Sequence, residues 1–284
     1  MQGFLETIRF GTKFLLIFMC AIYLLQLTVL DSRIVSNLYF NPYQIICKFQ
    51  FWRVITSIFI HGGILHLVMN MMSFVSLGIS LESTIGTLSY FYHIILFGLL
   101  SGLIHIGIAY FMKLGGDIFE YRINGVGFSG VLFALMVVDI DLQPSESRSL
   151  FGLWLIPSFI YPWANLLIMQ LLLPNVSFFG HLSGMFVGYM YKYGWLKYLT
   201  PKKEFFEKIE NKLCVCCLNR TDYVKSGGIN NFVYRPYALF QNNLENEHEQ
   251  DQNQNNAHDF FTGQAHTIGE QNDHNINNHG DTDP

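Results

Sequence analysis

Six runs of apolar residues constrain the fold of this chain more than any other feature of its sequence. They cover roughly residues 14–30, 62–80, 88–112, 125–140, 150–173 and 176–196. A helix needs ~20 apolar residues to cross the hydrocarbon core of a bilayer. Only 13% of the 284 residues are charged, against about 25% in soluble domains. The sequence therefore predicts an all-α integral membrane protein, a bundle of six transmembrane helices.

The fourth run is shorter than the others, at about 15 residues against the ~20 that a lone span needs. A short helix is tolerated in a membrane when other helices enclose it and its end opens on a water-filled cavity. We therefore expect a short fourth helix at the centre of the bundle.

Composition divides the chain into three parts. Residues 1–200 hold nearly all the apolar runs and form the expected six-span membrane domain. Residues 201–240 follow as a basic juxtamembrane segment, and residues 241–284 are rich in Asn, Gln, His and Asp. The last part cannot bury enough apolar surface to offset its ordering entropy, so we expect a disordered tail. It offers a place for cytosolic partners, although it contains no clear recognition motif.

Basic residues near the helix ends set the expected orientation, because cytosolic loops are enriched in Lys and Arg. Arg9 and Lys13 precede the first run, and lysines are frequent after the sixth. Five basic residues fall on the opposite side, so the bias is moderate. We expect both termini in the cytosol, with the first run as an uncleaved signal anchor.

Four polar side chains stand inside the apolar runs, where they are costly and therefore indicate function. His66 and Asn70 are four residues apart, on one face of a helix. Ser129 follows Gly-Phe at the opening of the fourth run, and His181 is near the start of the sixth. We expect His66, Ser129 and His181 about four to six residues into their helices, roughly 6–10 Å below the non-cytosolic surface. Three separate positions thus converge on one plane.

Serine and histidine at one depth indicate acyl-transfer chemistry. A hydroxyl is a weak nucleophile until a neighbouring base takes its proton, and neutral imidazole is the usual base near pH 7. The first N–H groups of the fourth helix lack intrahelical partners, and with His66 and Asn70 they are candidate donors to an oxyanion. The acidic residues nearest this part of the sequence, Glu82, Asp139 and Asp141, lie near the cytosolic ends of the predicted spans, away from this plane. The sequence predicts a dyad of Ser129 and His181.

Two glycines in the sixth run favour this pairing. Gly184 and Gly188 form a G-x-x-x-G pair, which lets helix backbones approach closely. The pair is expected to bring His181 against Ser129.

Across roughly residues 10–200 the chain resembles the rhomboid intramembrane serine proteases. The resemblance is carried by short motifs at six places: Trp52-Arg53, His61, His66-Leu-Val-Met-Asn70, Leu81-Glu82 with Gly86, Gly127-Phe-Ser129-Gly130, and Gly180-His181 with Gly184 and Gly188. The fourth and sixth runs are most similar to the endoplasmic-reticulum subgroup. One departure is Phe133, where many members have Tyr; its ring can still stack on His181, but the hydroxyl is lost.

The resemblance implies a role for each matched residue. Ser129 would be the nucleophile and His181 the general base. His66, Asn70 and Gly127 would line the oxyanion hole or position the substrate.

It also implies the setting of the reaction. Trp52 and Arg53 in the first loop, and Gly184 and Gly188, would give structural support. The substrates would be transmembrane proteins in the lipid bilayer, cut in or beside their membrane helix with no metal ion or cofactor. We expect no nucleic-acid partner. The expected compartment is the endoplasmic reticulum, with the Golgi or another internal membrane as alternatives.

Other interpretations stay open. A rhomboid-like protein that binds transmembrane helices without cleaving them is the main alternative, although this chain keeps both the serine and the histidine. His93 and His105 are interpreted as interface or cavity-lining residues, and His61 as a residue on a water route or in a solvated loop. Three cysteines after the last run, Cys214, Cys216 and Cys217, are candidates for lipidation or for no modification at all.

Overall fold

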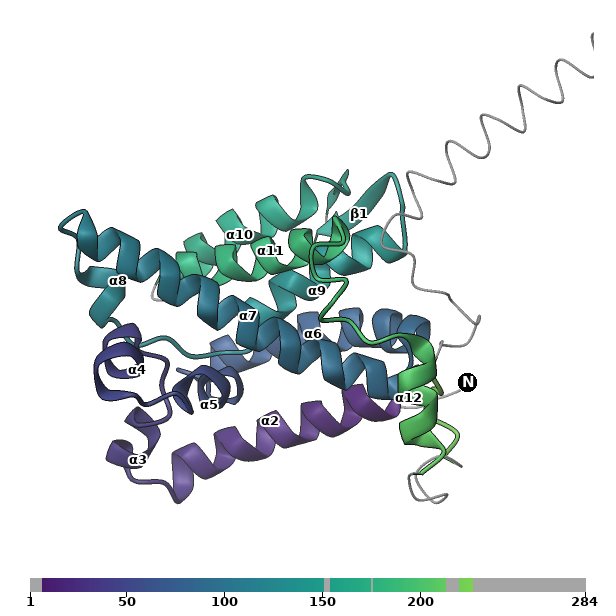
Figure 1. Cartoon of the computed structure of the whole chain (residues 1–284), viewed down its shortest axis with the longest axis horizontal. Coiled ribbons are helices and arrows are strands. Elements are labelled where there is room, and N and C mark those ends of the chain that lie inside the picture. The colour runs from purple at the N-terminus through teal and green to yellow at the C-terminus, as the bar shows by residue number, and fades with distance from the viewer. Residues whose placement is uncertain (1–6, 151–153, 175, 213–219, 227–284) are drawn as a thin grey trace, which may run out of the picture. The chain divides into compact units, whose positions relative to one another are not determined.

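The computed structural model describes residues 7–150, 154–174, 176–212 and 220–226 (Figure 1). Three helices in these ranges are long and apolar enough to cross a membrane: α2 (Phe10–Thr28), α6 (Ile64–Ile85) and α7 (Thr87–Leu114). Their buried stripes face the protein interior and their exposed residues are mostly apolar, as a helix in contact with lipid requires. The predominantly helical fold agrees with the predicted membrane protein.

Three short helices connect α2 to α6. They are α3 (Ser32–Ser36), α4 (Pro42–Lys48) and α5 (Arg53–Phe59). The side chain of Asp31 accepts a hydrogen bond from the Arg33 N–H at the start of α3, and Asn41 accepts one from Gln44 at the start of α4. These caps satisfy N–H groups that a helix start leaves open.

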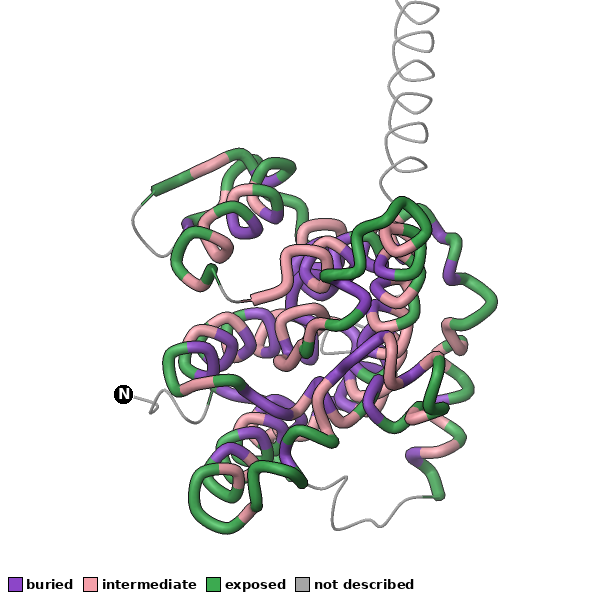
Figure 2. The backbone as a smooth tube through the Cα atoms, turned by 90° about the vertical axis from the view of Figure 1, so that its left-hand side faces the viewer, coloured by how far each residue is buried: buried purple, intermediate pink, exposed green. Residues whose placement is uncertain are grey.

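The short helix α9 (Ser129–Leu142) lies at the centre of the bundle, as expected (Figure 1). Every residue from Val131 to Asp139 is buried, and an apolar helix that is buried on all sides belongs to an interior. It packs against α6, α7 and α11 (Phe178–Lys192), and Figure 2 shows the buried segments gathered inside the molecule.

The expected fifth span, 150–173, is wrong in its first part. The chain there forms an antiparallel hairpin of β1 (Ser147–Leu150) and β2 (Trp154–Pro157), and α10 (Tyr161–Leu172) begins only afterwards. A short apolar run does not distinguish a strand from a helix, and Pro157 cannot donate within a helix. Helices α9, α10 and α11 have 14, 12 and 15 residues. They are therefore shorter than a lone span requires.

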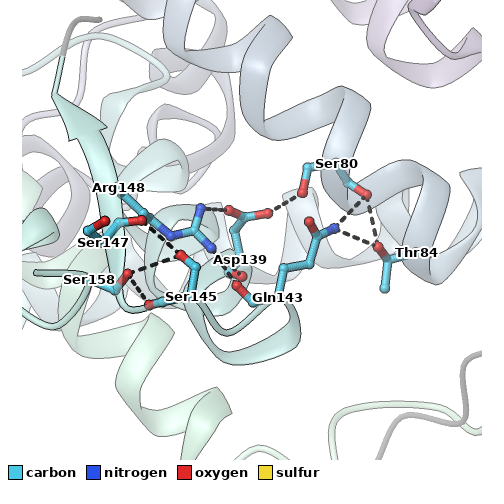
Figure 3. A network of polar contacts seen from close by, with 8 residues as sticks. All are labelled: Ser80, Thr84, Asp139, Gln143, Ser145, Ser147, Arg148 and Ser158. Carbon is cyan, nitrogen blue, oxygen red and sulfur yellow. Dashed lines mark hydrogen bonds and ion pairs between the residues drawn. The ribbon is translucent and has the colours of Figure 1, made fainter. Parts of the chain in front are cut away.

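The hairpin is tied to the ends of α6 and α9 by polar contacts (Figure 3). The carboxylate of Asp139 in α9 accepts hydrogen bonds from Ser80 of α6 and from Arg148 of β1. Gln143 donates to Thr84 of α6 at 3.0 Å. One buried acidic side chain thus joins three elements.

A second buried carboxylate fastens α2 to the α6–α7 corner. Glu82 is fully buried and accepts hydrogen bonds from the N–H groups of Gly11 and Thr12 at 2.7 and 2.8 Å. The hydroxyls of Thr12 and Thr87 donate to it at 2.8 and 2.7 Å. Two of these donors are at the N-terminus of α2, where a negative charge is favourable.

The juxtamembrane segment returns to the same corner. After α12 (Lys203–Glu210), the described residues 220–226 pack on the membrane domain. Thr87 N–H donates to the Val224 carbonyl at 2.8 Å, and Lys13 pairs with Asp222 at 2.7 Å. Part of the predicted juxtamembrane segment is therefore built into the fold.

Candidate active site

Ser129 and His181 meet where α9 and α11 begin. The Nε2 atom of His181 lies 2.8 Å from the Oγ atom of Ser129, within hydrogen-bonding distance. Ser129 is the first residue of α9 and His181 the fourth of α11. The expected offset of four to six residues past the helix start is therefore wrong for all three positions, since His66 is only the third residue of α6. For Ser129 the reason is Gly127 at φ +119°, which ends the extended approach, so that the helix starts two residues later.

Glycine contacts bring the two helices together. A Cβ atom at Gly184 would overlap the carbonyl oxygen of Gly130 and lie 2.8 Å from its carbonyl carbon. A Cβ at Gly188 would lie 2.7 Å from the carbonyl oxygen of Ala134. Since Gly130 follows Ser129 directly, the backbone contact at Gly184 sets the separation of Ser129 from His181.

His66 and Asn70, the second-helix pair, lie on the same side as the serine. The ring of His66 covers Gly127, where a Cβ would lie 2.6 Å from His66 Cε1 and 3.7 Å from Asn70 Nδ2. The Nε2 atom of His66 is buried and has no hydrogen-bond partner among the described residues. Asn70 Nδ2 donates to the His66 carbonyl at 3.0 Å. Three of the predicted oxyanion residues are thus in contact with one another.

The segment that leads into Ser129 is pinned by the first loop. Gly125 and Phe40 exchange two backbone hydrogen bonds, each of 2.9 Å. The N–H of Gly127 donates to the carbonyl of Ser57 at 2.9 Å. That N–H is therefore already used, and the donors left for an oxyanion are the first N–H groups of α9 and the His66 ring.

The His181 ring is buried and is held by stacking. Its centroid lies 4.7 Å from that of Phe133, with an angle of 30° between the planes. Its Nδ1 atom has no hydrogen-bond partner in the described part of the chain. No carboxylate is therefore hydrogen-bonded to this nitrogen within the described residues.

Two cavities meet at this pair. One, of about 80 Å³, is lined by Ser129 and His181 together with Ser101 and His105 of α7. The other lies between α6 and α10, and its lining includes His66, Asn70, Ser129 and His181. Ser129 therefore lines both a cavity within the bundle and one between two helices.

A polar cluster beside the first cavity was missed from the sequence. His105 Nε2 lies 3.2 Å from the carboxylate of Glu120, in the short helix α8 (Phe119–Arg122), and both side chains are buried. Ser177, which caps α11, lies 3.5 Å from both. An acidic residue shortly after a span that contains a histidine was the only available signal, and it does not reveal the pairing.

Trp52 and Arg53 hold the first loop by hydrogen bonds to its backbone carbonyls. The Arg53 guanidinium donates to the carbonyls of Ser36 and Tyr39 at 2.8 and 2.7 Å. Trp52 Nε1 donates to the Asn37 carbonyl at 3.1 Å. Together, the two side chains therefore bind the backbone at the end of α3 and in the segment between α3 and α4.

His61 lies just before α6, and its ring centroid is 5.4 Å from that of His66. Burial, with a smaller effect of His66, lowers the pKa of His61 to about 4. The ring is therefore neutral at physiological pH. Both of its nitrogens lack a partner within the described ranges.

Two of the sequence predictions lie outside the residues that the structure describes. They concern the lipidation of Cys214, Cys216 and Cys217, and the tail at 241–284.

Comparison with known proteins gives a consistent result. Residues 48–198 match the family model of the Rhomboid domain. The chain is 36% identical over 210 residues to "Rhomboid-like protein 15" of Arabidopsis thaliana, covering 72% of this chain and 51% of that protein. It is 35% identical over 146 residues to "Rhomboid-related protein 4" of Mus musculus, covering 51% and 46%. It is 31% identical over 167 residues to "Rhomboid-type serine protease 2" of Neurospora crassa, covering 57% of each. The chain spans about half the length of these relatives.

Proposed function

Because the chain belongs to the rhomboid family, we propose that it is an intramembrane serine endopeptidase that cleaves transmembrane proteins in or beside their membrane helix. The observation that supports this most directly is the 2.8 Å contact between Ser129 Oγ and His181 Nε2 at the ends of two buried helices. A hydroxyl in that position can pass its proton to imidazole as it attacks a carbonyl.

In the proposed mechanism, Ser129 Oγ attacks the scissile carbonyl carbon while its proton moves to His181 Nε2. When the tetrahedral intermediate collapses, the C–N bond breaks and His181 gives the proton to the leaving amine. Water then attacks the acyl-enzyme, with His181 again taking and returning a proton. Burial of the ring excludes bulk water, and stacking on Phe133 fixes its plane.

The oxyanion of the intermediate is assigned to the first N–H groups of α9 and to His66. His66 Nε2 is buried without a described partner, which suits a donor that is needed only when negative charge develops. Gly127 lets the His66 ring lie against the backbone before Ser129. Asn70 holds the backbone of His66 and also lines the cavity.

We propose that the substrate approaches through the cavity between α6 and α10. An extended segment of a transmembrane protein can reach Ser129 from that side. His66, Asn70 and His181 line the same cavity. No metal ion or cofactor takes part in this mechanism.

The topology and compartment are also proposals. A six-span bundle would use α2, α6, α7, α9, α10 and α11, in a membrane domain of residues 1–200 with a juxtamembrane segment at 201–240 and a disordered tail at 241–284. Lysines after α11 favour both termini in the cytosol. The resemblance of α9 and α11 to the endoplasmic-reticulum subgroup favours that compartment, with the Golgi or another internal membrane as alternatives. Cytosolic partners would be recruited by the tail.

The decisive experiment compares the wild type with Ser129→Ala and His181→Ala, each co-expressed with a single-span transmembrane substrate. We expect cleavage by the wild type alone. Ser183→Ala is the matched control, because Ser183 is two residues from His181 on α11 but bonds only locally, to the Phe179 carbonyl at 2.6 Å. Labelling of Ser129 by a fluorophosphonate probe gives a readout that needs no substrate.

Equal cleavage by the wild type and both active-site variants would reject the protease proposal. If the wild type captures the substrate without cutting it and also fails to react with the probe, the non-proteolytic alternative is favoured.

A further inference from the structure

A buried pair of one histidine and one glutamate lies beside the proposed catalytic histidine, His181. The side chains of His105 and Glu120 are 6% and 9% exposed, and their Nε2 and Oε2 atoms are 3.2 Å apart. Burying a carboxylate is costly unless it is paired and hydrogen-bonded. The pair connects the end of α7 to α8, and Phe40 of the first loop stacks on the His105 ring at 4.8 Å.

The pair touches the beginning of the helix that carries His181. The Oγ atom of Ser177 lies 3.5 Å from Glu120 Oε2 and accepts a hydrogen bond from the Gly180 N–H at 3.0 Å. The carbonyl of Ser177 accepts the His181 N–H at 3.2 Å. Glu120 therefore acts at the N-terminus of α11, within one turn of His181.

We propose that Glu120 is a positioning residue for the protease, acting through His105 and Ser177 to favour proton uptake by His181. This inference rests on the proposed function. It assigns a role to a carboxylate outside the dyad, contributed by the loop after α7.

The physical reason is the charge that develops during the reaction. When Ser129 attacks, His181 becomes an imidazolium three residues into α11, at the positive end of the helix dipole. Glu120, held against His105 Nε2 at 3.2 Å, brings its carboxylate to this N-cap. That charge offsets the dipole at the point where positive charge appears, in surroundings with little water to screen it.

The other ionisable groups nearby act differently. Arg122 of α8 lies over the Tyr43 ring at 5.7 Å, and Lys113 of α7 lies over Tyr121 at 4.4 Å, so both cations are engaged with rings. From α6, His66 faces the dyad across the second cavity, the one between α6 and α10.

The test uses the full chain, with Glu120→Gln as the main variant because it keeps the shape of the side chain and removes its charge. We expect kcat to fall roughly tenfold with KM unchanged, since the carboxylate acts on the charge of the transition state. Labelling of Ser129 by a fluorophosphonate probe should slow to a similar degree. Glu120→Asp retains the charge and should recover most of the lost rate. Asp117→Asn is the matched control, because it removes an exposed carboxylate of the same loop that caps the Phe119 N–H, and it should match the wild type.

His105→Gln tests the link independently and also serves if Glu120→Gln fails to fold. It should lower kcat by a similar factor. The double variant should then be no slower than the slower single variant, because both changes break one pair.

Three results distinguish failure of the role assigned to Glu120 from failure of the proposed protease function. Wild-type kcat and labelling in Glu120→Gln, with only a lower unfolding temperature, would overturn the inference and leave the protease proposal intact. Additive losses in the double variant would also overturn it. If instead the wild type neither cleaves nor labels above Ser129→Ala, the proposed function itself has failed.

Discussion

Substituting alanine for Gly184 tests how tightly the fold controls the Ser129–His181 contact. The added Cβ atom would overlap the Gly130 carbonyl oxygen and lie 2.8 Å from the carbonyl carbon. Non-bonded carbons are most stable at about 3.5–4.0 Å, so α9 and α11 must separate by roughly 1 Å. The contact of 2.8 Å between Ser129 and His181 would then exceed the distance of a hydrogen bond.

The expected losses differ between stability and activity. Overpacking of this kind costs about 1–3 kcal/mol of unfolding free energy. A misplacement of about 1 Å in a reacting pair can reduce the rate about a hundredfold. Gly184→Ala should therefore remain folded while losing nearly all cleavage and probe labelling, measured on protein purified in detergent with unfolding followed in parallel.

Two matched substitutions complete the series. Gly188→Ala meets the Ala134 carbonyl oxygen at 2.7 Å, but one turn further from His181, so its effect on activity should be smaller. Gly107→Ala in α7 meets nothing within 4 Å and should be neutral or slightly stabilising. Labelling of Gly184→Ala at the wild-type rate would refute the idea that this glycine contact sets the dyad distance.

Three further predictions concern stability, each measured by unfolding of the purified protein. Glu82→Ala leaves buried donors on α2 without their acceptor and should cost about 2–5 kcal/mol, whereas Glu82→Gln, which keeps one oxygen, should cost less. Arg148→Ala leaves the buried Asp139 charge without its partner and should cost about 2–4 kcal/mol; adding Asp139→Asn should recover part of that loss, and additive losses would contradict the pairing. Hydrogen bonding from Arg220 lowers the pKa of Asp222 from 3.8 to about 2. Because the folded-state pKa is the lower one, the stabilisation is present above about pH 4 and lost as the pH falls through about 2, so the difference between wild type and Asp222→Asn should vanish there.

The sequence predicted much of the fold because lipid allows few solutions. Apolar runs as long as those of α2, α6 and α7 can only be helices when their backbone polar groups face hydrocarbon. The short central helix was predicted from the length of the fourth apolar run alone. The pairing of β1 with β2 was missed, because the short apolar stretch before Pro157, at the start of the fifth run, fits a strand as well as a helix.

In the candidate site, too, the sequence predicted some of the residues and missed others. His66, Asn70, Ser129 and His181 could be selected from the sequence, because polar side chains inside apolar runs are rare and costly. Glu120 could not be selected in this way, because it lies outside the predicted spans, in the short helix α8, where a carboxylate is ordinary.

The sequence by itself therefore determined the membrane class, the long helices α2, α6 and α7, and the candidate side chains for acyl-transfer chemistry. Only the tertiary structure decided which of them touch. The 2.8 Å contact of Ser129 with His181 depends on backbone packing at Gly184, and the partner of Glu120 depends on how α7 and α8 meet. Spacing along a helix fixes which residues share a face, but the distance between helices is set by the packing of every side chain between them.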